Sequence, residues 1–110
     1  MTPKIARFLE VQRPATPCLV LDVDRVEQNY RALAEALPLA RIYYAVKANP
    51  ARQVLERLVG LGSAFDAASW EEIELALAAG AGPDSVSYGN TVKKESAIAR
   101  AFAAGVRLYA

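Results

Sequence analysis

The hydrophobic positions of the chain follow two alternating patterns. Short apolar runs, typical of buried strands, lie at 17–21, 42–46, 63–68, 85–88 and 106–110. Between them, apolar residues recur every three or four positions, as on the buried face of a helix. Helices are therefore predicted from Asp22 or Asp24 to Pro38, from Pro50 to Gly60, from Ser69 to Gly80, and from Val92 or Lys93 to Gly105. The first residues, 1–16, contain two prolines and are expected to form an arm.

Regular alternation of strand and helix predicts an α/β fold with parallel strands joined by right-handed crossovers. The two candidates are a (β/α)8 barrel and an open doubly wound sheet. No Gly-x-Gly-x-x-Gly follows a strand, which weakens the dinucleotide-binding version of the second. The repeats would make about half of a barrel, and no helix follows the strand at 106–110, so the sequence reads as truncated.

The strand at 42–46 ends on Lys47. Asn49 is a candidate N-cap of the next helix, with Pro50 at its first position. Alternation places Ala45 and Lys47 on one face of this strand. An amine at the end of a buried strand is suited to Schiff-base chemistry if burial lowers its pKa. The alternative is a solvated lysine at a strand end.

Other polar residues are predicted at the same edge, because functional groups of parallel βα folds gather at the carboxyl ends of the strands. Asp66 ends the second barrel strand and Asn90 follows the third. Asp66 would face inward with Lys47, beside small residues, and the inner layer is expected to contain Ala45, Ala64 and Val86. Asp66 has an alternative reading as a solvated carboxylate, and Asn90 as a turn residue. Helix capping alone explains Ser69 and Glu72.

Composition restricts the function further. The chain has 110 residues, 54% of them hydrophobic, and 13 basic against 12 acidic residues, which gives no electrostatic case for nucleic acid or membrane binding. It has no histidine and a single cysteine, which excludes histidine-based catalytic triads and makes a transition-metal site improbable. No apolar stretch approaches the ~18 residues of a membrane span. These features predict a soluble cytoplasmic protein.

Two motifs carry a family resemblance. Tyr-Ala-Val-Lys-Ala-Asn-Pro at 44–50 resembles the pyridoxal-phosphate lysine motif of the fold-type III decarboxylases that act on ornithine, lysine and diaminopimelate. Phe-Asp-Ala-Ala-Ser at 65–69, followed by Glu72, is similar to the second signature of that family and lies at the matching distance. The resemblance extends from about Pro17 to the end of the sequence.

The resemblance implies an N-terminal half of a (β/α)8 barrel that binds pyridoxal 5'-phosphate. Residues 22–110 would be the first part of the barrel. Residues 1–21 would be an arm and a strand that belongs to a separate C-terminal β-domain. Lys47 would form the Schiff base, with Asp66 beside it and Ala45 lining the pocket. The full-length enzyme is expected to be a homodimer acting on a small amino acid, and these 110 residues alone are expected to be inactive.

The subfamily rests on the third motif. Tyr-Gly-Asn-Thr-Val-Lys-Lys at 88–94 resembles the branch that decarboxylates ornithine or lysine and so produces diamines such as putrescine. A diaminopimelate decarboxylase is the nearest alternative. An amino-acid racemase of the same barrel type is disfavoured, because Pro50 follows the lysine motif in place of a Tyr-Gly-His run. A non-catalytic homologue that regulates a partner protein is the alternative from another class, although it would have no chemical need for Lys47 and Asp66.

Overall fold

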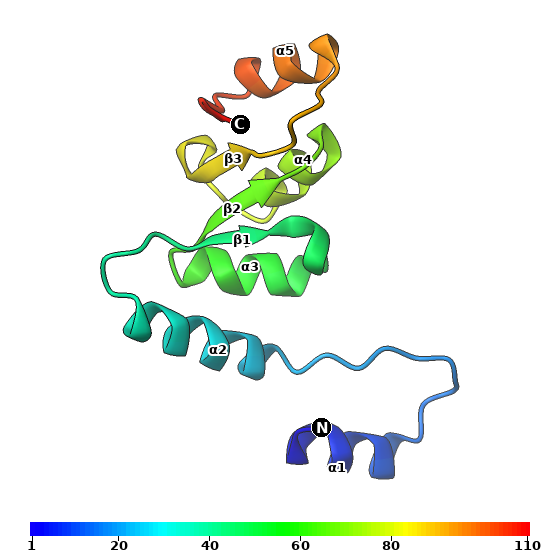
Figure 1. Ribbon diagram of the computed structural model, residues 1–110. Helices are drawn as coiled ribbons and strands as arrows, with labels where there is room; N and C mark the ends of the chain where they lie inside the picture. Colours follow the sequence, from blue (N-terminus) through cyan, green and yellow to red (C-terminus); the bar gives the residue numbers. More distant parts are fainter.

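The computed structural model describes all residues from 1 to 110 and has a sheet of four parallel strands, ordered as they occur along the chain (Figure 1). The strands are β1 (Tyr43–Ala45), β2 (Ala64–Ala67), β3 (Val86–Tyr88) and β4 (Leu108–Tyr109). The helices are α1 (Pro3–Gln12), α2 (Val23–Ala36), α3 (Arg52–Gly60), α4 (Trp70–Ala78) and α5 (Glu95–Ala103), with 3₁₀ turns η1 (Val46–Ala48) and η2 (Pro83–Ser85). A helix joins each strand to the next, and the strand order never reverses. This confirms the predicted barrel-type sheet over the doubly wound alternative.

Alternate residues of the strands pack into one hydrophobic core under α3, α4 and α5. Phe65 and Ala67 of β2 are fully buried, and Val86, the register partner of Phe65, is 1% exposed. The rest of this core comes mainly from the helices: Val54, Leu55, Leu58, Ile73, Ala76 and Ala101. Val86 therefore lies on the helix-covered face, and its predicted place in the inner layer with Ala64 is wrong. Periodicity within one strand does not fix its register against the next strand.

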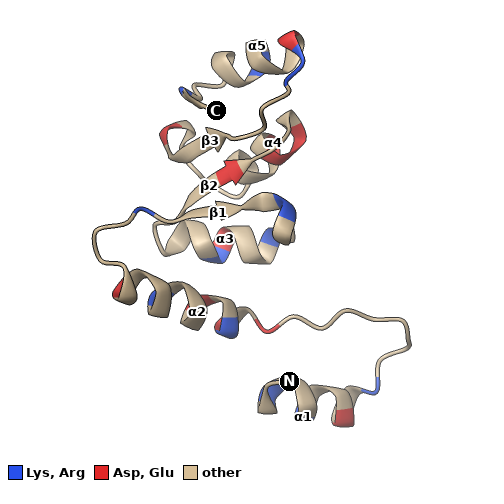
Figure 2. Ribbon diagram, in the orientation of Figure 1, with Lys and Arg blue, Asp and Glu red and all other residues tan.

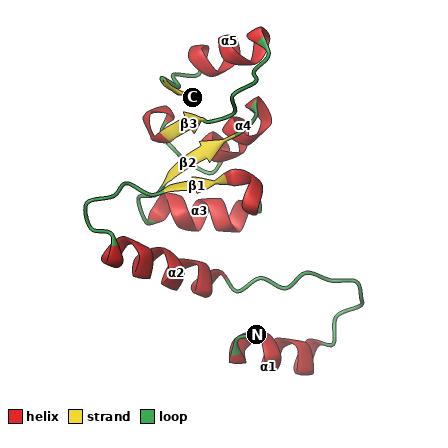
Figure 3. Ribbon diagram, viewed as in Figure 1, coloured by secondary structure: helices red, strands yellow, loops and turns green.

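The other face of the sheet carries a row of register partners that run across all four strands, Ala45, Asp66, Ser87 and Leu108. The first three are half-buried and Leu108 is 48% exposed. No helix covers this face (Figures 1 and 3). In a (β/α)8 barrel the uncovered face is the one that turns inward.

Helix ends follow the sequence signals at most positions. Ser69 caps α4 by accepting a hydrogen bond from the Glu72 amide, 3.3 Å away. Gly80 (φ 101°) and Gly105 (φ 97°) take the left-handed conformation two residues after the last residues of α4 and α5. Two helix starts differ from prediction, since α3 begins at Arg52 and α5 at Glu95.

The N-terminal residues differ most from the prediction. The expected arm contains the ten-residue helix α1, capped by the Thr2 hydroxyl with Pro3 at its first position. Residues 17–21 form no strand, and their backbones make no hydrogen bonds to other backbone groups. A strand exists only when a neighbouring strand satisfies its backbone groups, and no strand pairs with these residues. In Figure 1 helix α1 lies away from the sheet.

Polar contacts link α1 to the next helices. The Thr2 hydroxyl donates to Asp22 (2.8 Å), and the Lys4 ammonium pairs with Asp24. Arg57 of α3 pairs with Glu27 of α2 at 2.6 Å and with Asp24 at 3.4 Å. The hydrogen bond from Thr2 is the main cause that lowers the pKa of Asp22, and the one from Lys4 is the main cause for Asp24. The acidic partners thus lie at the start of α2, and the basic partners come from α1 and α3; Figure 2 shows charged residues on all three helices.

Candidate functional site

The polar candidates lie at the carboxyl edge of the parallel sheet. Asp66 is on β2, whereas Lys47 follows β1 in the turn η1, because β1 ends at Ala45, earlier than predicted. Figure 2 shows the acidic segment of β2 and the basic segment after β1 at the same edge. The Lys47 side chain is exposed and forms no hydrogen bond or ion pair. The expected burial of this amine is absent here, since the uncovered face offers nothing to bury it.

Ala45 and Asp66 are direct register partners on adjacent strands, so their side chains lie next to each other on the uncovered face. Lys47 is two residues beyond Ala45 along the chain. The side chain of Ala45 is a single methyl group, so it adds little bulk beside the carboxylate. The register thus brings the three predicted site residues to one corner of the sheet.

Gly89 is a neighbour of Asp66 that sequence reasoning missed. A Cβ built on Gly89 would lie 2.1 Å from Oδ1 of Asp66 and 2.9 Å from its Cγ. The carboxylate thus occupies the space above the glycine, directly after β3. The Gly-Asn pair at 89–90 was visible in the sequence as a turn signal, but the contact with Asp66 is between strands and leaves no local pattern.

The turn that carries Lys47 is anchored by the residues around it. Val46, the first residue of the turn, is fully buried in the core. The Tyr44 hydroxyl donates to the carbonyl oxygen of Asn49 (3.2 Å), and burial raises the pKa of this phenol. The Asn49 side chain accepts a hydrogen bond from the Ala51 amide at 3.0 Å. Asn49 is therefore not the N-cap of α3 but closes a short turn before it, because the helix starts later than predicted.

The segment after Asp66 is held by a variant of the capping box. The Glu72 carboxylate accepts from the Ala68 amide at 2.7 Å, one residue before the N-cap Ser69. The adjacent Glu71 lies at the helix start, where backbone hydrogen bonding, foremost, lowers its pKa. These contacts support the capping reading of Ser69 and Glu72, and they fix the backbone that follows Asp66.

Asn90 and Tyr88 have structural roles in this arrangement. The Asn90 amide donates to the carbonyl oxygen of Val92 at 2.9 Å, so the turn reading of this residue is confirmed. Tyr88 is 3% exposed and packs on Tyr109 with ring centroids 6.1 Å apart. The Lys93 ammonium lies 5.2 Å from the Tyr88 ring centroid and also donates to the Ala110 carbonyl.

The donor set of this corner restricts its chemistry. An exposed primary amine is a nucleophile for an aldehyde once it loses its proton, and Asp66 supplies a carboxylate one strand away. No three histidine, cysteine, aspartate or glutamate side chains gather as metal ligands. The amine and the carboxylate at this corner therefore fit an aldehyde cofactor held by Lys47.

No helix combines the length and the apolar character that crossing a bilayer requires.

The parallel sheet and the polar residues at the carboxyl ends of its strands define the class of protein. The chain forms the first βα units of a (β/α)8 barrel and presents a lysine amine at the carboxyl edge of the sheet. Residues 23–110 match the family described as pyridoxal-dependent decarboxylase, pyridoxal binding domain. The chain belongs to this family, which confirms both the resemblance and the expected pyridoxal cofactor.

Individual relatives agree with this assignment. The chain is 44% identical over 82 residues to the lysine/ornithine decarboxylase of Selenomonas ruminantium, an alignment that covers 74% of this chain and 21% of that protein. The lysine/ornithine decarboxylase of Vibrio vulnificus complexed with cadaverine superposes with a TM-score of 0.90 at 32% identity, over 99% of this chain and 30% of that one. Antizyme inhibitor 2 of Xenopus laevis is 37% identical over 89 residues, 81% of this chain and 20% of that protein. The chain thus spans less than a third of the length of these relatives.

Proposed function

We propose that this chain is the cofactor-binding N-terminal part of a pyridoxal-phosphate-dependent decarboxylase that converts ornithine or lysine to a diamine. The observation that carries the proposal is the placement of Lys47: an exposed amine, in the family's lysine motif, at the sheet edge where Asp66 also lies. The names of the Selenomonas and Vibrio relatives support ornithine and lysine as substrates over diaminopimelate.

The three site residues have different roles in this proposal. Lys47 would hold the cofactor through Nζ, and once the substrate amine has taken that place the free amine of Lys47 would be available to deliver a proton to the carbon that loses carbon dioxide. The Asp66 carboxylate stabilises the positive charge on the nitrogen that Lys47 or the substrate amine places at this corner of the sheet. Ala45 leaves room for the flat ring. When bound, pyridoxal phosphate supplies the electron sink for loss of carbon dioxide.

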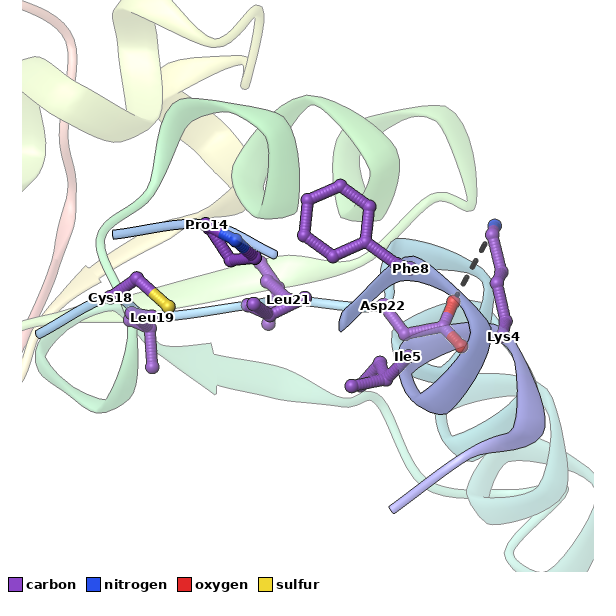
Figure 4. Close-up of a pocket in the computed structure, with 9 residues that line it drawn as sticks. Lys4, Ile5, Phe8, Pro14, Cys18, Leu19, Leu21 and Asp22 are labelled. Atoms are coloured by element: carbon purple, nitrogen blue, oxygen red, sulfur yellow. Dashed lines mark ion pairs between the residues drawn. The ribbon is translucent and has the colours of Figure 1, made fainter. Parts of the chain in front are cut away.

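The remaining proposals concern the rest of the protein. Residues 22–110 form the first part of the barrel, and residues 17–21 pair with a strand of a β-domain. Support for this pairing comes from the free backbone groups of 17–21 and from a neighbouring cavity of about 390 Å³ (Figure 4). The cavity lies between α1 and this segment and has mostly apolar walls, formed by Ile5, Phe8, Pro14, Leu19, Val20 and Leu21 together with Lys4, Cys18 and Asp22. We further propose a cytoplasmic homodimer.

Borohydride trapping tests the role of Lys47. The full-length protein is incubated with pyridoxal phosphate, reduced, digested and mapped by mass spectrometry. We expect the pyridoxyl group on Lys47, and its loss together with most turnover in Lys47→Ala. Lys94→Ala is the matched control, because Lys94 is an exposed lysine just before α5 and should leave both signals intact. Reproducible labelling of another lysine in place of Lys47 contradicts the proposal.

A regulatory homologue is the second candidate, favoured by the match to antizyme inhibitor 2. Such a protein would bind a partner and release no carbon dioxide. Incubation of the full-length protein with ornithine, lysine and diaminopimelate, followed by measurement of carbon dioxide and products, separates this candidate from the enzyme. The same products distinguish the decarboxylase subfamilies and a racemase.

A further inference from the structure

We propose that Tyr44 and Asn49 are positioning residues that hold the turn carrying Lys47 in place. This inference rests on the proposed function, because it assigns their role through the lysine that binds the cofactor. The Lys47 side chain has no partner of its own in the structure. The position of the Lys47 amine therefore depends on where the backbone of η1 holds the Cα atom of this residue.

The first fixed point is the Tyr44 ring. It lies on the helix-covered face of β1 and meets the ring of Phe65 edge to face, with centroids 6.4 Å apart and an interplanar angle of 82°. Phe65 is fully buried, so the Tyr44 ring packs against a residue of the close-packed core. Its hydroxyl then reaches past the turn and donates to the carbonyl oxygen of Asn49, at 3.2 Å. This bond closes a loop of six residues with Lys47 inside it.

The second fixed point is the exit from the turn. Asn49 has φ −160° and ψ 104°, the extended conformation that a following proline favours. Its side-chain oxygen accepts from the Ala51 amide at 3.0 Å, immediately before α3. The two hydrogen bonds thus use both the carbonyl and the side chain of Asn49. They tie the turn to β1 on one side and to α3 on the other.

The chemical consequence follows from the length of the lysine side chain. An amine on a flexible four-carbon chain reaches one atom reproducibly only when its Cα is fixed. Loosening the turn would spread the positions of Nζ without altering its chemistry. We therefore expect slower attachment of the cofactor with a correctly folded protein.

Tyr44→Phe is the main test, in the full-length protein, with Tyr43→Phe as its matched control. Both changes remove one hydroxyl, but Tyr43 lies on the opposite face of β1 and its hydroxyl makes no hydrogen bond. In the cofactor-free protein we expect Tyr44→Phe to raise amide hydrogen exchange at Ala48, Asn49 and Ala51 by about three- to tenfold, the range for one lost hydrogen bond. Borohydride-trapped label on Lys47 at short times should fall by a similar factor. Tyr43→Phe should leave both unchanged.

A second pair of variants leaves the core untouched. Asn49→Ala removes the acceptor for the Ala51 amide, whereas Asn49→Asp keeps one, so the alanine variant should show the same two changes and the aspartate variant should recover. If Tyr44→Phe instead loosens α3 and the whole core, the Asn49 pair decides the matter. Equal behaviour of Tyr44→Phe and Tyr43→Phe, or of Asn49→Ala and Asn49→Asp, overturns the inference. A wild-type protein that never labels on Lys47 refutes the proposed function instead.

Discussion

The carboxylate of Asp66 lies in the space that a side chain on Gly89 would need, because its Oδ1 is only 2.1 Å from the point where a Cβ atom would lie. Asp66 lies on β2 and Gly89 directly follows the neighbouring strand β3. Asp66 is a candidate for the chemistry of the site. The absence of a side chain at Gly89 therefore allows the carboxylate to take this position. Its backbone is not in the left-handed region, so the requirement for glycine comes from space and not from φ.

Gly89→Ala should leave the fold intact and turn the Asp66 side chain into another rotamer. Only the end of one short side chain must move, so we expect a loss of stability below about 1.5 kcal/mol. NMR couplings of the Asp66 side chain and thermal unfolding measure the two effects. Gly60→Ala is the control, because nothing lies within 4 Å of a Cβ at that position. An unchanged Asp66 rotamer would contradict this prediction.

Asp66→Ala should slow turnover or weaken cofactor binding without unfolding the full-length protein. Asp66 is half-buried on the uncovered face and its carboxylate makes no hydrogen bond, so little packing is lost. Titration with pyridoxal phosphate, steady-state turnover and a denaturation curve measure the three quantities. Full activity of the variant would reduce Asp66 to a solvated carboxylate at the end of a strand.

Phe65→Ala should destabilise the protein by about 3–5 kcal/mol, the usual cost of removing a buried phenylalanine side chain. Phe65 is fully buried and supports the Tyr44 ring. Urea unfolding gives the difference in free energy. The matched control is Phe102→Ala, since Phe102 is 57% exposed and contacts Arg107 on the surface, and this change should cost far less.

Acid should detach α1 before it unfolds the sheet. The pKa values of Asp22 and Asp24 are lowered below the ordinary value of 3.8, chiefly by the hydrogen bonds from Thr2 and Lys4. Their contribution is therefore fully present above pH 3.8 and is lost as the pH falls from there through the lowered values. NMR signals of α1 should shift in this range while those of α3 stay constant. Asp24→Asn should loosen α1 already at neutral pH, and an α1 that stays docked in acid would refute the role of these carboxylates.

Residues 1–110 expressed alone should neither hold pyridoxal phosphate tightly nor release carbon dioxide from an amino acid. The face with Ala45 and Asp66 has no opposite wall, and β4 has no neighbour on its outer edge. Titration with the cofactor and size-exclusion chromatography should show weak binding and self-association through that edge. Saturable tight binding together with turnover would show that half a barrel is sufficient.

Local signals made much of the fold predictable. Ser69 at the start of α4, and Gly80 and Gly105 after the helices, are read from a few neighbouring residues, and the structure uses them as expected. The helix α1 was also signalled, by Thr2 before Pro3, but the prolines favoured an arm. A threonine cap followed by a proline is a stronger signal for a helix than the composition of this segment is for an arm.

Relationships between strands could not be predicted in the same way. The placement of Val86 beside Phe65 depends on register, and the approach of Asp66 to Gly89 depends on two strands at once. The residues at 17–21 have strand-like composition, yet a strand requires a partner that composition cannot supply. The position of Lys47 one turn beyond β1 likewise depends on where the hydrogen bonds with β2 stop.

Because helices cover only one face of the sheet, alternate residues of β2 have different roles. Phe65 and Ala67 face the helices and carry stability, whereas Asp66, between them, faces the open side. Selection can therefore act on stability at positions 65 and 67, and on chemistry at position 66, almost independently, although these positions are immediate neighbours in the gene. A line of descent is free to alter the chemistry at position 66 while its scaffold stays constant, and this gives one physical route by which a catalyst and a non-catalytic relative come to share a fold.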